Sequence, residues 1–173
     1  MALEITDSNC ISESRLNYNS NKNSMSRKFV LIFSLILLIT LKLNGQNIDD
    51  LKLSENEIPA SYSLVEENNC ISIQACTFYE KPETFAAIIG KLKEKQIQSF
   101  DSKKDKGSIM YFEFENNFER EDFLKSFIWG GSNPTKEHPE EIYSKGKILI
   151  IWSFNQNSEI AKKSKDKIKK ILK

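Results

Sequence analysis

The chain has 173 residues, of which 39% are hydrophobic and 11 are phenylalanine, which is enough for the core of one small domain. Its 25 basic and 24 acidic side chains leave a net charge of +1, so the composition lacks the basic excess typical of nucleic-acid-binding proteins. Only three of the basic residues are arginine, and this further disfavours bidentate contacts with phosphates or guanines.

The first 45 residues have the pattern of a leader. A short basic stretch after Met25 is followed by the apolar run 29–41 and then by polar residues that end at Gly45. A basic region, an apolar run and a small residue before the cut are typical of a secretory signal peptide. We therefore expect residues 25–45 to be a signal peptide that is cleaved between Gly45 and Gln46.

Two features of this leader keep alternatives open. The run 29–41 is shorter than the about 20 apolar residues of a membrane span, but Leu43 stands where a small residue is preferred for cleavage. The protein is thus expected to be periplasmic or secreted, with anchoring by an uncleaved 29–41 segment as the alternative. Residues 1–24 are polar and lack apolar periodicity, so we expect either a disordered extension or a true start at Met25.

Residues 46–173 are expected to form a single α+β domain. Residues 70–79 alternate in the manner of a strand, and residues 81–96 carry apolar side chains at helical spacing. The segments 96–102 and 107–115 then predict two strands that are joined as a hairpin by a charged turn. On the second of these strands, one face holds Ile109, Tyr111, Glu113 and Glu115, and we expect this face to be mostly exposed.

The second half of the domain continues this alternation. Residues 115–129 predict a helix with Asn116 as its N-cap, Glu119 completing a capping box and Gly130 as its C-cap. A polar loop follows, and the last two elements are a nearly continuous apolar strand and a lysine-rich amphipathic helix, at residues 145–154 and 158–173.

This order of elements predicts the ferredoxin-like β-α-β-β-α-β arrangement with an additional C-terminal helix. One detail conflicts with that plan. The fourth strand of a ferredoxin-like sheet lies at an edge, whereas the apolar segment 145–154 is typical of a strand that is covered on both faces. Either the last helix shelters this strand, or the strand order differs.

Cys70 and Cys76 pose a choice between a strand and a disulfide-closed loop. Six residues of strand would separate them by about 20 Å, whereas the Cα atoms of a disulfide lie within about 7 Å of each other. The intervening residues include none that favours a sharp bend. We therefore expect a strand with two free thiols, although pairing is the default for two cysteines in an exported domain.

His138 is the only histidine, and it lies beside three glutamates in the polar loop. An imidazole among carboxylates could hold a divalent cation or supply a general base, but the lack of a defined spacing favours a solvated loop. A ligand groove could be lined by the aromatic residues Trp129, Trp152, Tyr111 and Tyr143. A small core uses the same residue types, and the core is the favoured place for them. We expect no catalytic residue, no metal ligand and no cofactor.

The last helix concentrates positive charge. Its seven lysines against two acidic residues give residues 158–173 a charge of +5, while residues 46–157 carry −6. Either its apolar side packs on the domain and the lysines are solvated, or it binds anionic lipid or an acidic partner. The residues that we expect as ligand or partner contacts are Trp129, His138, Lys162, Lys163, Lys169 and Lys170.

Taken together, the sequence predicts an exported, non-catalytic α+β module that binds an unidentified protein or small molecule in the cell envelope. A small hydrolase or metal-dependent enzyme that uses the His138 loop is the first alternative. Association with a lipid surface through the basic C-terminal helix is the second. Nucleic acid is not an expected partner.

Overall fold

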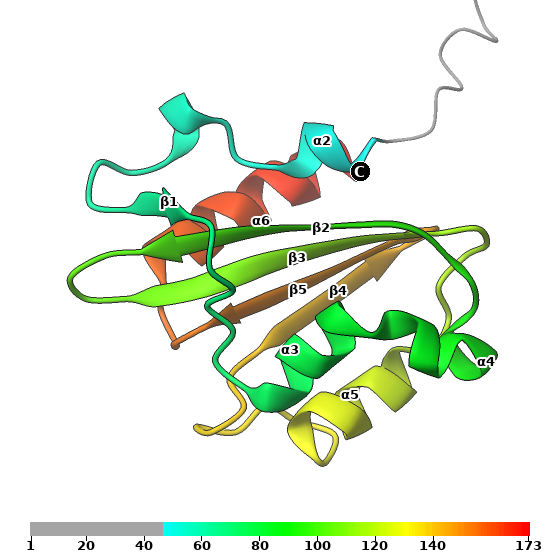
Figure 1. Cartoon of the computed structure of the whole chain (residues 1–173). Helices are drawn as coiled ribbons and strands as arrows, with labels where there is room; N and C mark the ends of the chain where they lie inside the picture. The colour runs from blue at the N-terminus through cyan, green and yellow to red at the C-terminus, as the bar shows by residue number, and fades with distance from the viewer. Residues whose placement is uncertain (1–46) are drawn as a thin grey trace, which may run out of the picture. The chain divides into compact units, whose positions relative to one another are not determined.

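A five-stranded antiparallel sheet with helices on both faces makes up residues 47–173, the part of the chain that the computed structural model describes (Figure 1). The strands are ordered β1-β2-β3-β5-β4 across the sheet. Their bounds are Ser63–Val65 for β1, Leu92–Asp101 for β2, Lys106–Phe114 for β3, Glu141–Lys145 for β4 and Ile148–Phe154 for β5. The fold is thus α+β, as the sequence predicts, and the predicted extension and signal peptide lie outside the described residues.

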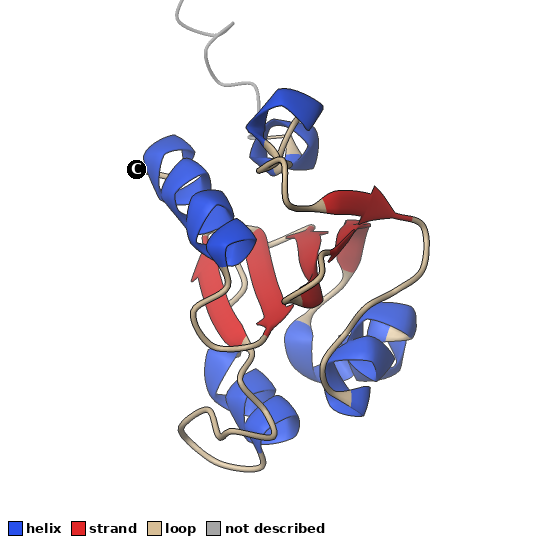
Figure 2. Ribbon diagram, turned by 90° about the vertical axis from the view of Figure 1, so that its left-hand side faces the viewer, coloured by secondary structure: helices blue, strands red, loops and turns tan. Residues whose placement is uncertain are grey.

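Helix α6 (Glu159–Ile171) and the short helix α2 (Ile48–Leu51) cover one face of the sheet, as Figure 1 and Figure 2 show. The 3-10 turn η2 (Glu55–Glu57) follows α2. Because every second strand side chain points to the same face, β3 and β5 each contribute alternate residues to this side. The first core cluster consists of Ile48, Leu51, Leu53, Phe100, Ile109, Tyr111, Ile148, Ile150, Trp152, Phe154, Ile160, Ala161, Ile168 and Leu172.

Short helical segments cover the opposite face: α3 (Ile73–Glu80), the 3-10 turn η3 (Pro82–Phe85), α4 (Ala86–Ile89) and α5 (Glu121–Trp129). The second core cluster consists of Ala75, Phe78, Ile89, Met110, Phe112, Phe114, Phe118, Leu124, Ile128, Leu149 and Ile151. Both clusters are built from residues of the unit Gln46–Lys173, so this unit supplies its own hydrophobic cores.

Strand β5 is buried on both faces, as its apolar sequence predicts. It lies inside the sheet, paired with β3 on one side and with β4 on the other. The sequence analysis did not predict β4, which forms a hairpin with β5 and occupies the edge. This additional edge strand removes the conflict that the ferredoxin-like plan leaves open.

The ferredoxin-like order is not confirmed, because the segment predicted as the first strand, residues 70–79, is mostly helical. The hydroxyl of Ser72 accepts the amide of Ala75 at 3.2 Å and caps the start of α3. Ala75 and Phe78 then face the core, whereas the side chain of Ile73 is 82% exposed. The alternation of apolar residues therefore does not reflect a strand.

The prediction of free thiols is wrong for the same reason. Cys70 and Cys76 form a disulfide, with their Cα atoms 5.6 Å apart. The first turn of α3 shortens the path between the two residues, which a strand would have extended to about 20 Å. A strand over these residues would still exclude the disulfide. The residues are mostly helical instead, and the disulfide is present.

The helix predicted over residues 81–96 is only partly present. Pro82 begins the helical segment as expected, but Gly90 ends it with a φ of 89°, a conformation that favours glycine. From Leu92 the chain runs as β2, a strand whose polar sequence lacks an alternating pattern. The sequence predicts a strand only from Gln96 onward, and the pairing of β2 with β3, nine Cα partners long with a bulge near Leu92, begins the strand four residues earlier.

The hairpin of β2 and β3 is confirmed, but one face of β3 differs from the prediction. Met110, Phe112 and Phe114 point into the second cluster as expected. On the other face Ile109 and Tyr111 are fully buried rather than exposed, because that face lies in the first cluster with α2 and α6.

Helix α5 is also confirmed, although it begins at Glu121 and not next to Asn116. The preceding amides are used elsewhere, since Glu115 donates to the carbonyl of Lys91 at 3.0 Å and Phe118 to that of Gly146 at 2.7 Å. Gly130 closes the helix in the left-handed region, as predicted. The amphipathic helix at the C-terminus is α6.

Candidate functional site

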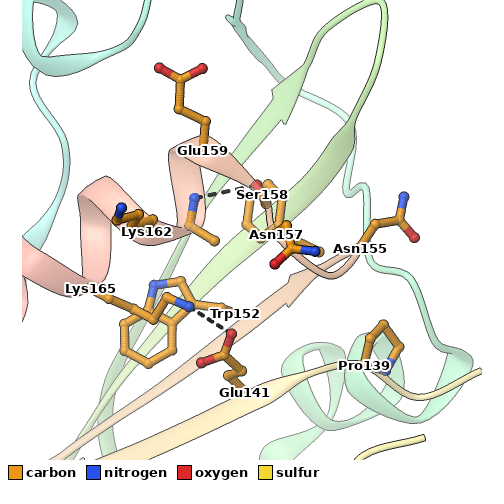
Figure 3. A pocket seen from close by; sticks show the side chains of 11 residues that line it. Pro139, Glu141, Trp152, Asn155, Asn157, Ser158, Glu159, Lys162 and Lys165 are labelled. Carbon is orange, nitrogen blue, oxygen red and sulfur yellow. Dashed lines mark hydrogen bonds and ion pairs between the residues drawn. The ribbon is translucent and has the colours of Figure 1, made fainter. Parts of the chain in front are cut away.

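A cleft of about 460 Å³ lies at the N-terminal end of α6, where the helix meets β4 and β5 (Figure 3). Helix α6 and the turn before it contribute most of its walls, and Trp152 lies on its floor. The lining residues are Pro139, Glu141, Trp152, Phe154, Asn155, Asn157, Ser158, Glu159, Ala161, Lys162 and Lys165.

Three polar contacts join the walls and floor of this cleft. Lys165 Nζ lies 2.6 Å from Glu141 Oε1, and the Ser158 hydroxyl accepts the amide of Ala161 at the start of α6. The Trp152 indole donates to the hydroxyl of Ser164 at 3.1 Å. The contacts of Lys165 and Trp152 hold α6 on the sheet, whereas Lys162, which also lines the cleft, is in no ion pair within residues 47–173.

His138, the residue that the sequence singles out for chemistry, lies half-buried at the end of the polar loop. Its backbone amide donates to the Thr135 hydroxyl at 3.1 Å, and its Nδ1 is buried without a hydrogen-bond partner among the described residues. Within residues 47–173, no group of three or more His, Cys, Asp or Glu residues is arranged to hold a metal ion.

Glu140 is a buried residue that the sequence analysis did not single out. Its side chain is fully buried, its Oε1 accepts from the Ser153 hydroxyl at 3.4 Å, and its Oε2 has no partner within the described residues. Its backbone carbonyl accepts the indole N–H of Trp129 at 2.9 Å. Trp129 therefore joins α5 to the residue that precedes β4.

The four aromatic residues considered for a ligand groove are divided between the two clusters, with Trp129 packed against the second, and of the four Trp152 lines the cleft. Tyr111 and Trp152 are buried in the first cluster, and burial raises the pKa of the Tyr111 phenol. Tyr143 packs against that cluster with its ring 6.5 Å from Trp152. Of the candidate contacts, Trp129 and His138 are half-buried, and the four lysines are exposed. The structure does not bring these six residues into one site.

A row of serines across the sheet holds the disulfide-bonded segment. The amide of Asn69 donates to Ser108 at 3.0 Å, and the amide of Ile71 donates to Ser153 at 2.7 Å. The hydroxyls of Ser99 and Ser108 are 2.9 Å apart. Ser108 and Ser153 thus satisfy two partly buried backbone amides, a role that the sequence does not indicate because serine is common in loops.

The lysines of α6 fall into two sets. Lys165 and Lys167 face the body of the domain, where they pair with Glu141 and Glu57. The hydrogen bonds that Lys167 and Ser54 donate lower the pKa of Glu57 to about 2. The remaining lysines of this segment are exposed, and they are Lys162, Lys163, Lys169, Lys170 and Lys173.

Comparisons with known proteins assign no family to this chain. No protein-family model, no curated protein and no solved structure matches it. Among residues 47–173 the structure contains no helix that is both long and apolar enough to cross a membrane.

Proposed function

We propose that this chain is an exported, non-catalytic α+β module that binds a partner in the cell envelope. The observation that carries the proposal is the disulfide between Cys70 and Cys76. Disulfides persist in oxidising compartments and are rare where thiols are kept reduced. The signal-like pattern of residues 25–45, with a cut between Gly45 and Gln46, supports the same compartment independently.

Two neighbouring carboxylates that could act as a catalytic pair are each held in a separate ion pair. The carboxylates of Glu113 and Glu115, which could have worked as a pair, each lie 2.7 Å from a separate lysine, Lys93 and Lys91. A general base or nucleophile needs a group within hydrogen-bond reach of its target, and these carboxylates are already engaged.

The intact mass of the protein recovered from the envelope of its own host tests this proposal. We expect a chain that begins at Gln46 and is lighter than its reduced form by two hydrogens, with no alkylation of Cys70 or Cys76 until a reductant is added. A chain recovered from the cytosol with both thiols open to alkylation would overturn the proposal. An oxidised chain that keeps residues 29–41 would still support a location in the envelope, but as a membrane-anchored protein rather than a secreted one.

An enzyme that uses the His138 loop is a second candidate, and it rests on two buried atoms. His138 Nδ1 and Glu140 Oε2 lie two residues apart in sequence, and neither has a partner in the described part of the chain. Such groups carry an energetic cost that a bound ligand could offset. Under this candidate His138→Ala abolishes metal uptake or activity, while Glu137→Ala, a change at the exposed neighbouring carboxylate, does not.

A further inference from the structure

Five exposed lysines lie along the outer side of α6. We call them the lysine face: Lys162, Lys163, Lys169, Lys170 and Lys173. At 3.6 residues per turn the four lysines within α6 fall on one side of the helix, together with Glu159 and Asp166, and Lys173 lies two residues beyond the end of the helix. None of the five pairs with a carboxylate of residues 47–173. The lysine face therefore presents a net charge of +3 to solvent.

The lysine face takes no part in the packing of α6 on the sheet. Ile160, Ile168 and Leu172 already hold α6 on the sheet, and all three are buried. The ion pairs with the body are made by Lys165 and Lys167 alone. Glu159 and Asp166 lie three or four positions from the helical lysines of the face, a spacing that modestly supports the helix. Two acidic side chains do not balance the lysines, so a net positive charge is left facing solvent.

The chemistry of the face favours a fluid anionic surface over a protein partner. Protein interfaces concentrate binding energy in Trp, Tyr and Arg side chains that fill pockets, and the lysine face has none of these. Lysines are flexible point charges, and mobile headgroups can meet each of them without a matching shape. We propose that the lysine face of α6 docks the domain on a membrane surface of anionic phospholipid headgroups.

This inference rests on the proposed function and names the partner class. The contact is peripheral, because the apolar side of α6 is buried in the first cluster and is not free to enter a bilayer. Binding through exposed charges alone is screened by salt within about 10 Å. The structure thus predicts binding that requires anionic lipid, weakens strongly with salt and leaves α6 packed on the sheet.

The test uses residues 46–173, the mature chain, which supplies both of its own cores. Flotation with vesicles of phosphatidylcholine and phosphatidylglycerol at low salt is expected to carry the protein upward. Vesicles of phosphatidylcholine alone, or the mixed vesicles at high salt, are expected to leave it behind. Binding to both kinds of vesicle, or binding that salt does not weaken, would overturn the proposal.

Two matched double variants locate the contact. Lys169→Gln with Lys170→Gln removes two charges from the lysine face, and Lys103→Gln with Lys104→Gln removes two exposed charges from the β2–β3 turn. At about fivefold in partitioning per lysine, the first pair is expected to weaken binding about twenty-five-fold and the second to have little effect. Equal weakening by both pairs would mean a diffuse charge effect and would contradict the proposal.

In a Trp129→Phe variant, which leaves Trp152 as the one tryptophan, the emission of Trp152 reports whether α6 stays in place. Its indole is 3% exposed and donates to Ser164 under the helix. We expect no shift of tryptophan emission on vesicle binding. A shift to longer wavelength would mean that α6 leaves the sheet and inserts, which overturns docking through the lysine face.

Binding to polyglutamate distinguishes an acidic protein partner from a lipid partner. Capture of the protein by immobilised polyglutamate, with no flotation on anionic vesicles, would replace the lipid by an acidic polypeptide. An exported and oxidised chain that fails to float would refute this inference and leave the proposed function standing. A reduced cytosolic chain would refute the proposed function instead.

Discussion

The two faces of the sheet are stabilised in different ways. On one face a single helix of 13 residues, α6, covers most of the first cluster, and its N-cap is the side chain of Ser158. On the other face α3 has eight residues and α4 only four, and a disulfide closes the segment that leads into α3. Isolated helices shorter than about 12 residues are marginal in water.

The difference shows where each face obtains its order. The long helix α6 carries its own apolar side, cap and ion pairs, so its sequence and its packing agree. The short helices depend on what surrounds them, in particular a group of phenylalanine rings in which Phe78 contacts Phe85, Phe112 and Phe127 at ring-centroid distances of 5.2 to 6.5 Å. This contrast can be tested by removing the main support of each face in turn.

The largest effect is expected from Phe78→Ala on α3. Phe78 is fully buried, so its removal leaves a cavity beside three other aromatic rings. We expect the free energy of unfolding to fall by about 3–5 kcal/mol, measured by urea denaturation. Ile73→Ala on the same helix is the matched control, and because that side chain is 82% exposed we expect almost no change. Similar losses for both variants would contradict the packing of α3 described here.

On the α2 and α6 face the corresponding support is polar. Gln98 accepts the amide of Leu53 and donates to its carbonyl, both at 2.8 Å, and also accepts the Tyr111 hydroxyl at 2.9 Å. Gln98→Ala leaves these buried groups without partners, and we expect a loss of about 2–4 kcal/mol in the free energy of unfolding. Gln96→Ala removes only a contact with Glu94 and should cost little.

Hydrogen exchange can show whether the loss at Gln98 is local. We expect faster exchange around α2 in the Gln98→Ala protein, because the clamp on Leu53 is the side-chain contact that ties the end of α2 to β2. Exchange in α3 should be unchanged. Equal acceleration on both faces would mean that the two clusters do not behave as separate supports.

A smaller effect is expected from the disulfide. Replacing Cys70 and Cys76 by serine frees a short loop, and the loop-closure term predicts a loss of about 2 kcal/mol. A reductant should produce a similar loss in the wild-type protein and none in the double variant. Because the bond lies on the α3 face, we expect α6 to keep its protection from exchange. If reductant leaves the free energy of unfolding of the wild-type protein unchanged, the disulfide does not stabilise the fold and this prediction is wrong.

The same contrast explains which elements the sequence predicts. The sequence predicts helix α6 and strand β5 correctly because their apolar patterns match their burial. Helix α6 has one apolar side, and β5 is buried on both faces. Helix α3 is not readable, because alternate apolar residues resemble a strand while Ile73 is in fact exposed. The second half of strand β2 is predicted, but Leu92 continues the apolar spacing of the predicted helix, and residues 92–95 are strand because they pair with β3.

The candidate site is predicted in a similarly uneven way. The split of the α6 lysines into paired and exposed sets follows from helical spacing together with the position of the sheet, and only the spacing is visible in the sequence. The contacts of Glu140 and Ser153 depend on their burial, which the sequence does not indicate. Glu140 directly precedes the unpredicted strand β4, and the Ser153 hydroxyl accepts the amide of Ile71 from the disulfide-bonded segment. A single sequence holds no signal for contacts of that kind.

The smallest expected effect concerns the one ion pair that links η2 to α6. Glu57 accepts from Lys167 at 2.7 Å, and this bond together with those from Ser54 lowers the pKa of Glu57 from its usual value near 4.5 to about 2. A lowered carboxyl pKa stabilises the fold above the unfolded-state value and is lost as the pH falls toward the folded-state value. The contribution of Glu57 should therefore disappear as the pH falls from about 4.5 to about 2.

Comparison of the wild-type protein with Glu57→Gln across this range isolates the effect. Because the Glu57 side chain is 34% exposed, solvent screening reduces the contribution, and we expect a difference of about 1 kcal/mol near neutral pH and none at the acid end. Glu55→Gln on the same turn is the matched control, with a difference near zero at every pH. If the difference at Glu57 persists in acid, the pair acts through packing rather than charge, and α6 is held to η2 by the lysine stem.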